Sequence, residues 1–465
     1  MKNKLFLLLA LFFLSFSNAS AQVEDGQGTG LNFNDEQYSN DLTKAPLTRS
    51  LYGSSLPKSA SLKKYAPTPK SQGNYGTCVG WSSAFCGYTI VNSVQNNWTD
   101  KTTIDANTFS PGFIYSQIKL SSDNTCRIGS SISDALELMK TKGVPKYTDM
   151  EMSCPNSVPL DVFNKASNYK IQDFAKLFGI YDSESFKLNA IKKSLSENKP
   201  IIIGMKAPNS FNNAKNYWIP TENPEGNYGG HAMCVIGYDD DKFGGAFEVQ
   251  NSWGDSWGNQ GYIWIKYQDF FNWVKYAYEM IYIPKKTITN EKDLAGKIKL
   301  VESDGNTMSA YFNGNYYQTK NSYKSGTKFR IYISNNEPAF VYAFGSDETK
   351  KVFPVFPHQP NISPALNYKQ NDVAIPDEEH YIEMDNTVGT DYLCVLYSLN
   401  PIKIEEIHKK IENYTGSFEA KVKYALENKL VEQSNVNFNN NEVSFTATSK
   451  GKSIVAIIIA TNHVK

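Results

Sequence analysis

The stretch SQGNYGTCVGWSSAFC, residues 71–86, joins a glycine-rich loop to an apolar segment and places a cysteine at the junction. Residues 73–77 contain two glycines and an asparagine, which predicts a loop. From Trp81 to Val91 apolar residues recur at helical spacing. Cys78 is therefore expected at or near a helix N-terminus, where free N–H groups and the helix dipole favour the nucleophilic thiolate. On this stretch alone, a buried structural cysteine is an equally good interpretation.

A histidine and an asparagine further along the chain complete a possible catalytic set. The chain has five histidines, and only His231 precedes residue 350. It stands in NYGGHAMCVIGYDDD, residues 227–241, where a strand is predicted to follow the glycines. Asn251 opens NSWGDSWGNQGYIWIKY at the end of a second predicted strand. Cysteine, histidine and asparagine, in that order, supply a nucleophile, a base and a group that orients the base.

Together these motifs resemble the papain-like (C1 family) cysteine peptidases of the bacterial secreted type. The resemblance covers residues 56–285 and includes LPKSASLKKYAPTPKSQG, residues 56–73, at the entry to the domain. It implies an α+β, papain-like two-lobed fold, with a helical lobe and a β-barrel-like lobe on the two sides of a cleft. It also implies a peptidase that hydrolyses peptide bonds in protein or peptide substrates.

The resemblance assigns four catalytic roles. Cys78 is the nucleophile that forms a thioester, His231 is the acid and base, and Asn251 orients the imidazole. Gln72 lies six residues before the nucleophile, and its amide is expected to share the oxyanion hole with the Cys78 backbone N–H.

Two further positions match substrate-site positions of the family. Trp253 corresponds to the tryptophan that shields the hydrogen bond between asparagine and histidine, and Gly129 to a glycine whose backbone pairs with substrate. Core packing and a plain turn are the other interpretations of these two residues. The motif also departs from the family: Tyr75 replaces a half-cystine, and Val79 replaces an aromatic residue of the cleft.

The same resemblance bears on the six cysteines. Relatives bond the cysteine at the position of Cys126 to one at the position of Tyr75, and Cys154 also lacks its usual mate. A disulfide between Cys126 and Cys154 is therefore expected, with two free thiols or a bond to Cys86 as the alternatives. Buried free thiols are expected at Cys86, Cys234 and Cys394.

The N-terminus has the pattern of an export signal. A basic start, an apolar run from Leu5 to Phe16 and small residues before Gln22 predict a signal peptide over residues 1–21. Residues 22–55 are polar and are expected to form a flexible leader or a short propeptide. The expected location is secreted, either extracellular or periplasmic, where thiols meet an oxidising environment.

Residues 286–465 show alternating apolar patterns broken by turn residues, which predicts a β-rich accessory domain with a sandwich-like fold. The segment weakly resembles a β domain of unknown function found beside enzymes in bacterial secreted proteins. It is expected to dock substrate, bind a surface polymer or partner, or stabilise the enzyme. The apolar stretch Ser453–Thr461 is predicted to form a buried strand. The scattered His358, His380, His408 and His463 are each expected at the surface.

Composition narrows the partners. Lysine plus arginine total 47 and aspartate plus glutamate total 47, so net charge gives no reason to expect nucleic acid or an anionic membrane as a partner. No membrane span, metal or cofactor is expected. Two other functions remain open: a catalytically silent binding protein on a papain fold, and a related Cys–His acyl-transfer or amidase enzyme. Gln72 and the NSWG motif argue against the amidase, and the intact catalytic set argues against the silent protein.

Overall fold

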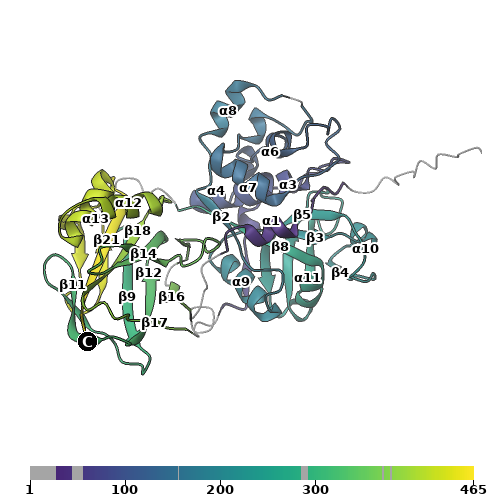
Figure 1. The fold of residues 1–465 in the computed structure, drawn as a ribbon. Helices are drawn as coiled ribbons and strands as arrows, with labels where there is room; N and C mark the ends of the chain where they lie inside the picture. The colour runs from purple at the N-terminus through teal and green to yellow at the C-terminus, as the bar shows by residue number, and fades with distance from the viewer. Residues whose placement is uncertain (1–27, 44–55, 156, 284–291, 369–370, 378–379) are drawn as a thin grey trace, which may run out of the picture.

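The structure is a computed structural model that describes residues 28–43, 56–155, 157–283, 292–368, 371–377 and 380–465. The chain forms a two-lobed α+β unit followed by a β-rich unit (Figure 1). The predicted signal peptide, and residues 284–291 between the two units, lie outside the described residues. Within the described residues, no helix has the length and hydropathy needed to cross a bilayer.

The helical lobe is organised around one long helix that starts at the predicted nucleophile. It begins as α3 (Cys78–Gly80), continues with π geometry in η2 (Trp81–Tyr88) and ends as α4 (Thr89–Gln95). The π segment is buried at every position, as expected for the central helix of a lobe. The other helices of the lobe are α5 Lys101–Ala106, α6 Pro111–Ile118, α7 Ile132–Thr141 and α8 Leu160–Ala166.

The second lobe is an eight-stranded sheet in the described residues, with strand order β2-β8-β3-β5-β6-β7-β4 and β1 on the edge of β5. Strands β3 and β5 are almost wholly buried, which matches their continuous apolar sequences. The strands are β1 Ser59–Ser61, β2 Asp173–Lys176, β3 Ile201–Lys206, β4 Tyr217–Trp218, β5 Gly230–Asp239, β6 Ala246–Gln250, β7 Tyr262–Lys266 and β8 Val274–Ile281. Helices α9 Glu184–Ser196, α10 Asn209–Asn212 and α11 Tyr267–Trp273 accompany them.

The described part of the leader is packed against both lobes. Leu31 and Tyr38 are buried, and α1 (Asp35–Asn40) lies across β8, as Figure 1 shows. The Tyr38 ring stacks on Tyr276 with centroids 4.2 Å apart, and its hydroxyl donates to the Phe178 carbonyl at 2.6 Å. Residues 28–43 are therefore packed, not a flexible leader as expected, because the apolar side chains of Leu31 and Tyr38 are buried against the first unit.

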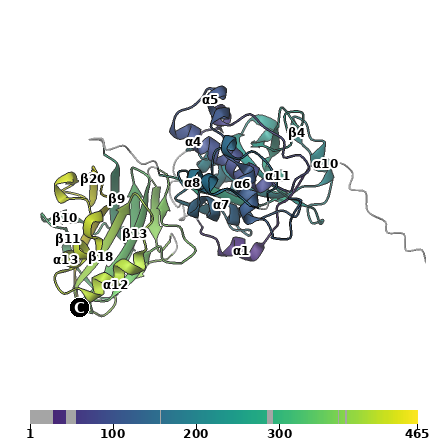
Figure 2. The same ribbon diagram turned by 90° about the horizontal axis from the view of Figure 1, so that it is seen from above.

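The C-terminal unit is a sandwich of two sheets (Figure 2). One sheet has the order β10-β11-β21-β18-β13-β14 with β15, and the other has β16-β12-β9-β20-β19 with β17. The predicted buried strand is β21, Ile454–Val464. The other strands are β9 Leu294–Glu302, β10 Ala310–Phe312, β11 Tyr317–Lys324, β12 Lys328–Asn335, β13 Ala339–Ser346, β14 Val352–Phe356, β15 Ala365–Leu366, β16 Asn371–Ile375, β17 Ile382–Glu383, β18 Gly389–Ser398, β19 Val436–Phe438 and β20 Ser444–Ala447. Helices α12 (Ile404–Asn413) and α13 (Phe418–Leu426) cover the outer face of the first sheet.

A buried carboxylate joins the two units. Glu279 on β8 is fully buried and accepts hydrogen bonds from Ser194, from the Asn367 amide at 2.8 Å and from the Tyr368 hydroxyl at 2.8 Å. Two of these three donors belong to the C-terminal unit. Apolar packing continues across the same boundary, because Ile281 packs in one cluster with strand residues of that unit. The C-terminal unit therefore completes the environment of a buried charge in the first unit.

We predict that Tyr368→Phe lowers the free energy of unfolding by about 1–3 kcal/mol, because a buried carboxylate loses a donor. Urea unfolding of the full chain measures the change. Tyr311→Phe is the matched control, since Tyr311 is 43% exposed in the same unit. Equal stability of the two variants would contradict the role given to the Glu279 contact.

Candidate active site

The strands of the second lobe bring His231 and Asn251 together. His231 is the second residue of β5, and Asn251 follows the last residue of the neighbouring β6. The ring Nε2 of His231 lies 2.7 Å from Asn251 Oδ1. An amide oxygen only accepts, so Nε2 carries the proton and Nδ1 is the basic nitrogen of the neutral ring. Nδ1 is buried and has no hydrogen-bond partner among the described residues, which leaves it available for proton exchange.

The start of the long helix places Cys78 against the same strand. The Ala232 backbone N–H, one residue after His231, donates to the Cys78 sulfur at 3.4 Å. Cys78 and His231 are both fully buried. The sequence-predicted nucleophile and base thus meet at the junction of the two lobes, one on a helix N-terminus and the other on a strand.

Gln72 is held rigidly beside this junction. Its Oε1 accepts a hydrogen bond from the Ser252 hydroxyl at 2.6 Å, and its Nε2 donates to the Tyr75 carbonyl at 2.7 Å. The side-chain amide has two N–H donors, and the Tyr75 contact uses one of them. Ser252 therefore joins Gln72 to the residue after Asn251, a connection that the sequence alone did not indicate.

The leader crosses this site as an extended strand. The Leu31 N–H donates to the Gly230 carbonyl at 2.9 Å, and the Ser130 N–H donates to the Gly30 carbonyl at 2.9 Å. Leu31 thereby bridges both lobes, antiparallel to Gly230 and parallel to Ser130. The backbone fit is close, because a methyl group on Gly30 would lie 2.1 Å from the Gly76 carbonyl oxygen. The cleft that the sequence predicted is filled by residues 28–31.

Burial under this strand sets the charge state of the pair. Burial raises the pKa of the Cys78 thiol to about 12, although backbone hydrogen bonds from Ala232 and Gly30 act in the opposite direction. Burial lowers the pKa of His231 to about 4, although the hydrogen bond to Asn251 raises it. At neutral pH both groups are uncharged in this conformation. The thiolate and imidazolium forms need water or substrate in place of the leader.

Trp253 and Gly129 line the two sides of the leader. The Trp253 ring stacks on His231 with centroids 4.7 Å apart, and its Nε1 donates to the Gly28 carbonyl at 2.9 Å. Gly129 has φ of +92°, and a Cβ there would lie 2.5 Å from the Gly30 carbonyl oxygen. A glycine at residue 129 is therefore needed both for backbone conformation and for the approach of an extended chain.

A polar loop that sequence reasoning missed supports Gly129. The Gly129 N–H donates to the Tyr115 hydroxyl at 2.8 Å, and that hydroxyl donates to Asp123 at 2.6 Å. Asp123 also accepts backbone N–H groups of Arg127 and Ile128. Asp123 in SSDNTCRIGS carried a turn signal, but nothing in the sequence pointed to Tyr115.

The structure contains the disulfide between Cys126 and Cys154, with Cα atoms 5.8 Å apart. Cys126 belongs to the loop that contains Asp123, and its carbonyl accepts a hydrogen bond from the Gly76 N–H at 2.7 Å. A backbone hydrogen bond thus links this loop to the nucleophile loop, although Tyr75 cannot form the usual bridge. The predicted buried free thiols are confirmed at Cys86, Cys234 and Cys394.

The chain is similar to known proteins over its first unit and part of its second. Residues 57–284 match the family described as papain family cysteine protease, and residues 322–401 match a domain of unknown function (DUF4384). An uncharacterized peptidase C1-like protein of Acanthamoeba polyphaga mimivirus is 25% identical over 233 residues, which are 44% of this chain and 68% of that protein.

Solved structures of cysteine proteases are also similar. Xylellain from Xylella fastidiosa is 20% identical with a TM-score of 0.45, over 56% of this chain and 97% of its own. The bromelain protease from Ananas comosus, in complex with the E64 inhibitor, is 18% identical with a TM-score of 0.39, over 48% of this chain and 98% of its own.

We predict that Gly30→Ala increases the rate of Cys78 alkylation by iodoacetamide at least about tenfold, because the methyl group forces the leader away and exposes the thiol. Peptide mapping by mass spectrometry measures the rate. Thr29→Ala is the matched control on the adjacent residue. If both variants react at the wild-type rate, residues 28–31 do not protect the thiol.

Proposed function

Residues 57–284 belong to the papain family of cysteine proteases, and we propose that the chain is an exported endopeptidase in which Cys78 is the nucleophile. The observation that carries this proposal is the placement of Cys78 on a helix N-terminus against β5, beside a histidine whose ring is oriented by Asn251. Its substrates are proteins or peptides. A binding protein without activity is disfavoured, because each of the four expected groups is present.

The proposed reaction uses these groups in order. The Cys78 thiolate attacks the peptide carbonyl, and the C–N bond breaks as His231 donates a proton to the leaving amine. Nε2 of His231 stays bonded to Asn251, so Nδ1 carries the transferred proton. The Cys78 N–H and the Gln72 amide stabilise the oxyanion. Water, deprotonated by His231, then hydrolyses the thioester and regenerates the thiol.

The leader supports a latent form of this peptidase. Residues 28–31 occupy the site where substrate must lie, and burial keeps both Cys78 and His231 uncharged. We therefore assign the leader as a short propeptide that must leave the cleft before turnover. The proposed residue boundaries are 1–21 for the signal peptide, 22–55 for the propeptide, 56–285 for the peptidase and 286–465 for the accessory domain.

We predict that Cys78→Ala lowers peptide hydrolysis at least about a thousandfold while the fold survives, because the covalent step is lost. A fluorogenic peptide library measures hydrolysis, in the otherwise native chain and in the Gly30→Ala chain with its open cleft. Circular dichroism checks the fold. Labelling of the native cysteine by a thiol-directed peptidyl epoxide separates an active enzyme from a silent one. Turnover near the native rate in folded Cys78→Ala protein would refute the assignment.

We predict that His231→Ala lowers kcat about 10²–10⁴-fold and that Asn251→Ala lowers it less, because the asparagine only aligns the base. Steady-state kinetics of purified variants measure both losses. The exposed Asn213 in the same lobe gives the control variant Asn213→Ala. Equal losses at residues 231 and 251, with both variants folded, would argue against this division of roles.

A further inference from the structure

The two sheets of the C-terminal sandwich line a cavity of ≈ 320 Å³ that is open to solvent on one side. Its walls are apolar side chains contributed by both sheets and by the loops between them: Leu300, Met308, Ile331, Val355, Met384 and Leu393. The volume falls within the range of about 300–1,000 Å³ typical of small-ligand sites. Protein interiors are close-packed, so this opening between the two sheets is space that an apolar group of a ligand can fill.

An aromatic ring lies at the edge of the cavity. Phe353 on β14 is 47% exposed, which is unusual for a phenylalanine of a sheet. Gly345 on the neighbouring β13 makes room for the ring, because a Cβ at residue 345 would lie 2.1 Å from it. One face of the Phe353 ring therefore lies over Gly345, and the rest of the ring is exposed to water. A face of this kind attracts cations.

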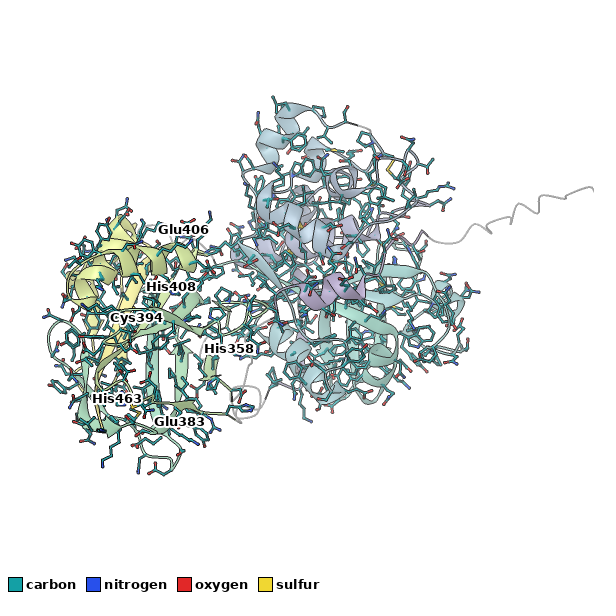
Figure 3. The ribbon with its side chains drawn as sticks, viewed as in Figure 1. His358, Glu383, Cys394, Glu406, His408 and His463 are labelled. Atoms are coloured by element: carbon teal, nitrogen blue, oxygen red, sulfur yellow. A yellow bond between two sulfur atoms is a disulfide. The ribbon has the colours of Figure 1, made fainter. Side chains whose placement is uncertain are left out.

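Four carboxylates lie around the same opening: Asp347, Glu383, Asp385 and Asp391. Glu383 and Asp385 are exposed, so the ring of charge faces solvent. Figure 3 shows Glu383 and His463 toward the end of the unit that is farthest from the peptidase. The apolar cavity thus has a negatively charged mouth.

Only part of this charge is balanced within the protein. Asp391 pairs with His463 at 2.9 Å, and Glu383 pairs with the exposed Lys328 at 3.5 Å. Asp347 and Asp385 accept hydrogen bonds from the neutral Thr349 and Thr387. Among the described residues neither of these two aspartates has a lysine, arginine or histidine within salt-bridge distance. Two carboxylates at the mouth therefore lack a cation.

His463 corrects a sequence prediction. It was expected at the surface, but it is 2% exposed on β21, because its strand lies inside the first sheet. Burial raises the pKa of its partner Asp391, the contact with His463 lowers it, and the like charges of Asp385 and Asp347 raise it again. The three aspartates are thus close enough to repel one another, and a bound cation would relieve that repulsion.

A metal ion fits this site poorly. Within the described residues, no three side chains of the metal-binding types converge closely enough to hold an ion. The carboxylates surround an apolar space, whereas hard cations need a compact shell of oxygen atoms. An organic cation attached to an apolar group matches both the apolar walls of the cavity and the carboxylates at its mouth.

We propose that this cavity binds an apolar cation, presented by a peptide segment in which a large apolar side chain stands next to a lysine or arginine. The apolar side chain fills the space between the sheets, and the basic side chain meets Asp347 and Asp385 beside the Phe353 ring. Charge-assisted hydrogen bonds to the carboxylates orient the segment. The inference concerns a site separate from the peptidase cleft and does not depend on the proposed catalytic function.

The test uses the full-length Cys78→Ala protein, so that a peptide probe stays intact. Isothermal titration calorimetry measures binding of acetyl-Gly-Phe-Lys-Gly-amide. The proposal expects saturable binding, which is lost when glutamate replaces the lysine of the probe and weakened when serine replaces its phenylalanine. In the protein, Asp385→Asn is expected to weaken binding about tenfold, because one charged contact is lost.

Two further variants make the result specific. Asp304→Asn removes one charge from an exposed turn residue that does not line the cavity and should leave binding unchanged. Val355→Phe reduces the cavity volume and should reduce binding, with thermal unfolding as the check on folding. Equal affinity for the lysine and glutamate probes, or equal effects of Asp385→Asn and Asp304→Asn, would overturn the proposal. Binding of 3-phenylpropylamine without binding of the peptide would overturn the assignment to a peptide.

Discussion

The contact between the start of the central helix and the start of β5 is the constraint on which the active centre depends. The backbone N–H of Ala232, the residue after His231, donates a hydrogen bond to the Cys78 sulfur and so holds the nucleophile beside the base. Each group belongs to a different lobe, so the chemistry exists only where the lobes are packed together. The buried core of both lobes is continuous, and this continuity holds the contact in place.

Because the two lobes are packed closely at the site, the charge states of Cys78 and His231 depend on what covers them. Extended backbone fits beside Gly129 and Gly230 because a Cβ at either residue would collide with the carbonyl oxygens of Gly30 and Leu31. When the leader fills that space, Cys78 and His231 lose water and their charged forms become unfavourable. Occupation of the cleft therefore controls both access to the thiol and its reactivity.

The C-terminal unit is connected to the peptidase at two levels. Asn367 and Tyr368 satisfy the buried Glu279, and the Thr43 backbone bonds to Asn361 and Ser363 at the end of the leader. The first contact supports β8, which pairs with β3 beside the His231 strand. The second contact anchors the chain after α1, beyond the residues that cross the cleft. The accessory unit thus touches both the scaffold of the site and the described leader at Thr43.

The sequence also has limits as a guide to buried polar contacts. Tyr115, Asp123 and Ser252 support the site, but their partners lie on other elements and no spacing rule relates them. The sequence of residues 22–55 predicts a flexible leader or a short propeptide, and Leu31 and Tyr38 stand there as isolated apolar residues without periodicity. Such residues become part of a core only when segments distant in the sequence pack around them.

What the sequence determined by itself was the local chemistry: a glycine loop that ends at Cys78, a histidine that enters a strand, and an asparagine that ends the next strand. Periodicity predicted individual helices and strands, because that signal is contained in neighbouring residues, and the family resemblance predicted their arrangement in two lobes. Only the tertiary structure decided the strand that fills the cleft, the burial of Glu279 between the two units and the charged cavity of the sandwich. These features depend on contacts between residues far apart in the chain, such as 88 positions for Asn367 and Glu279 and 225 positions for Gly28 and Trp253, and sequence patterns report only on neighbouring residues.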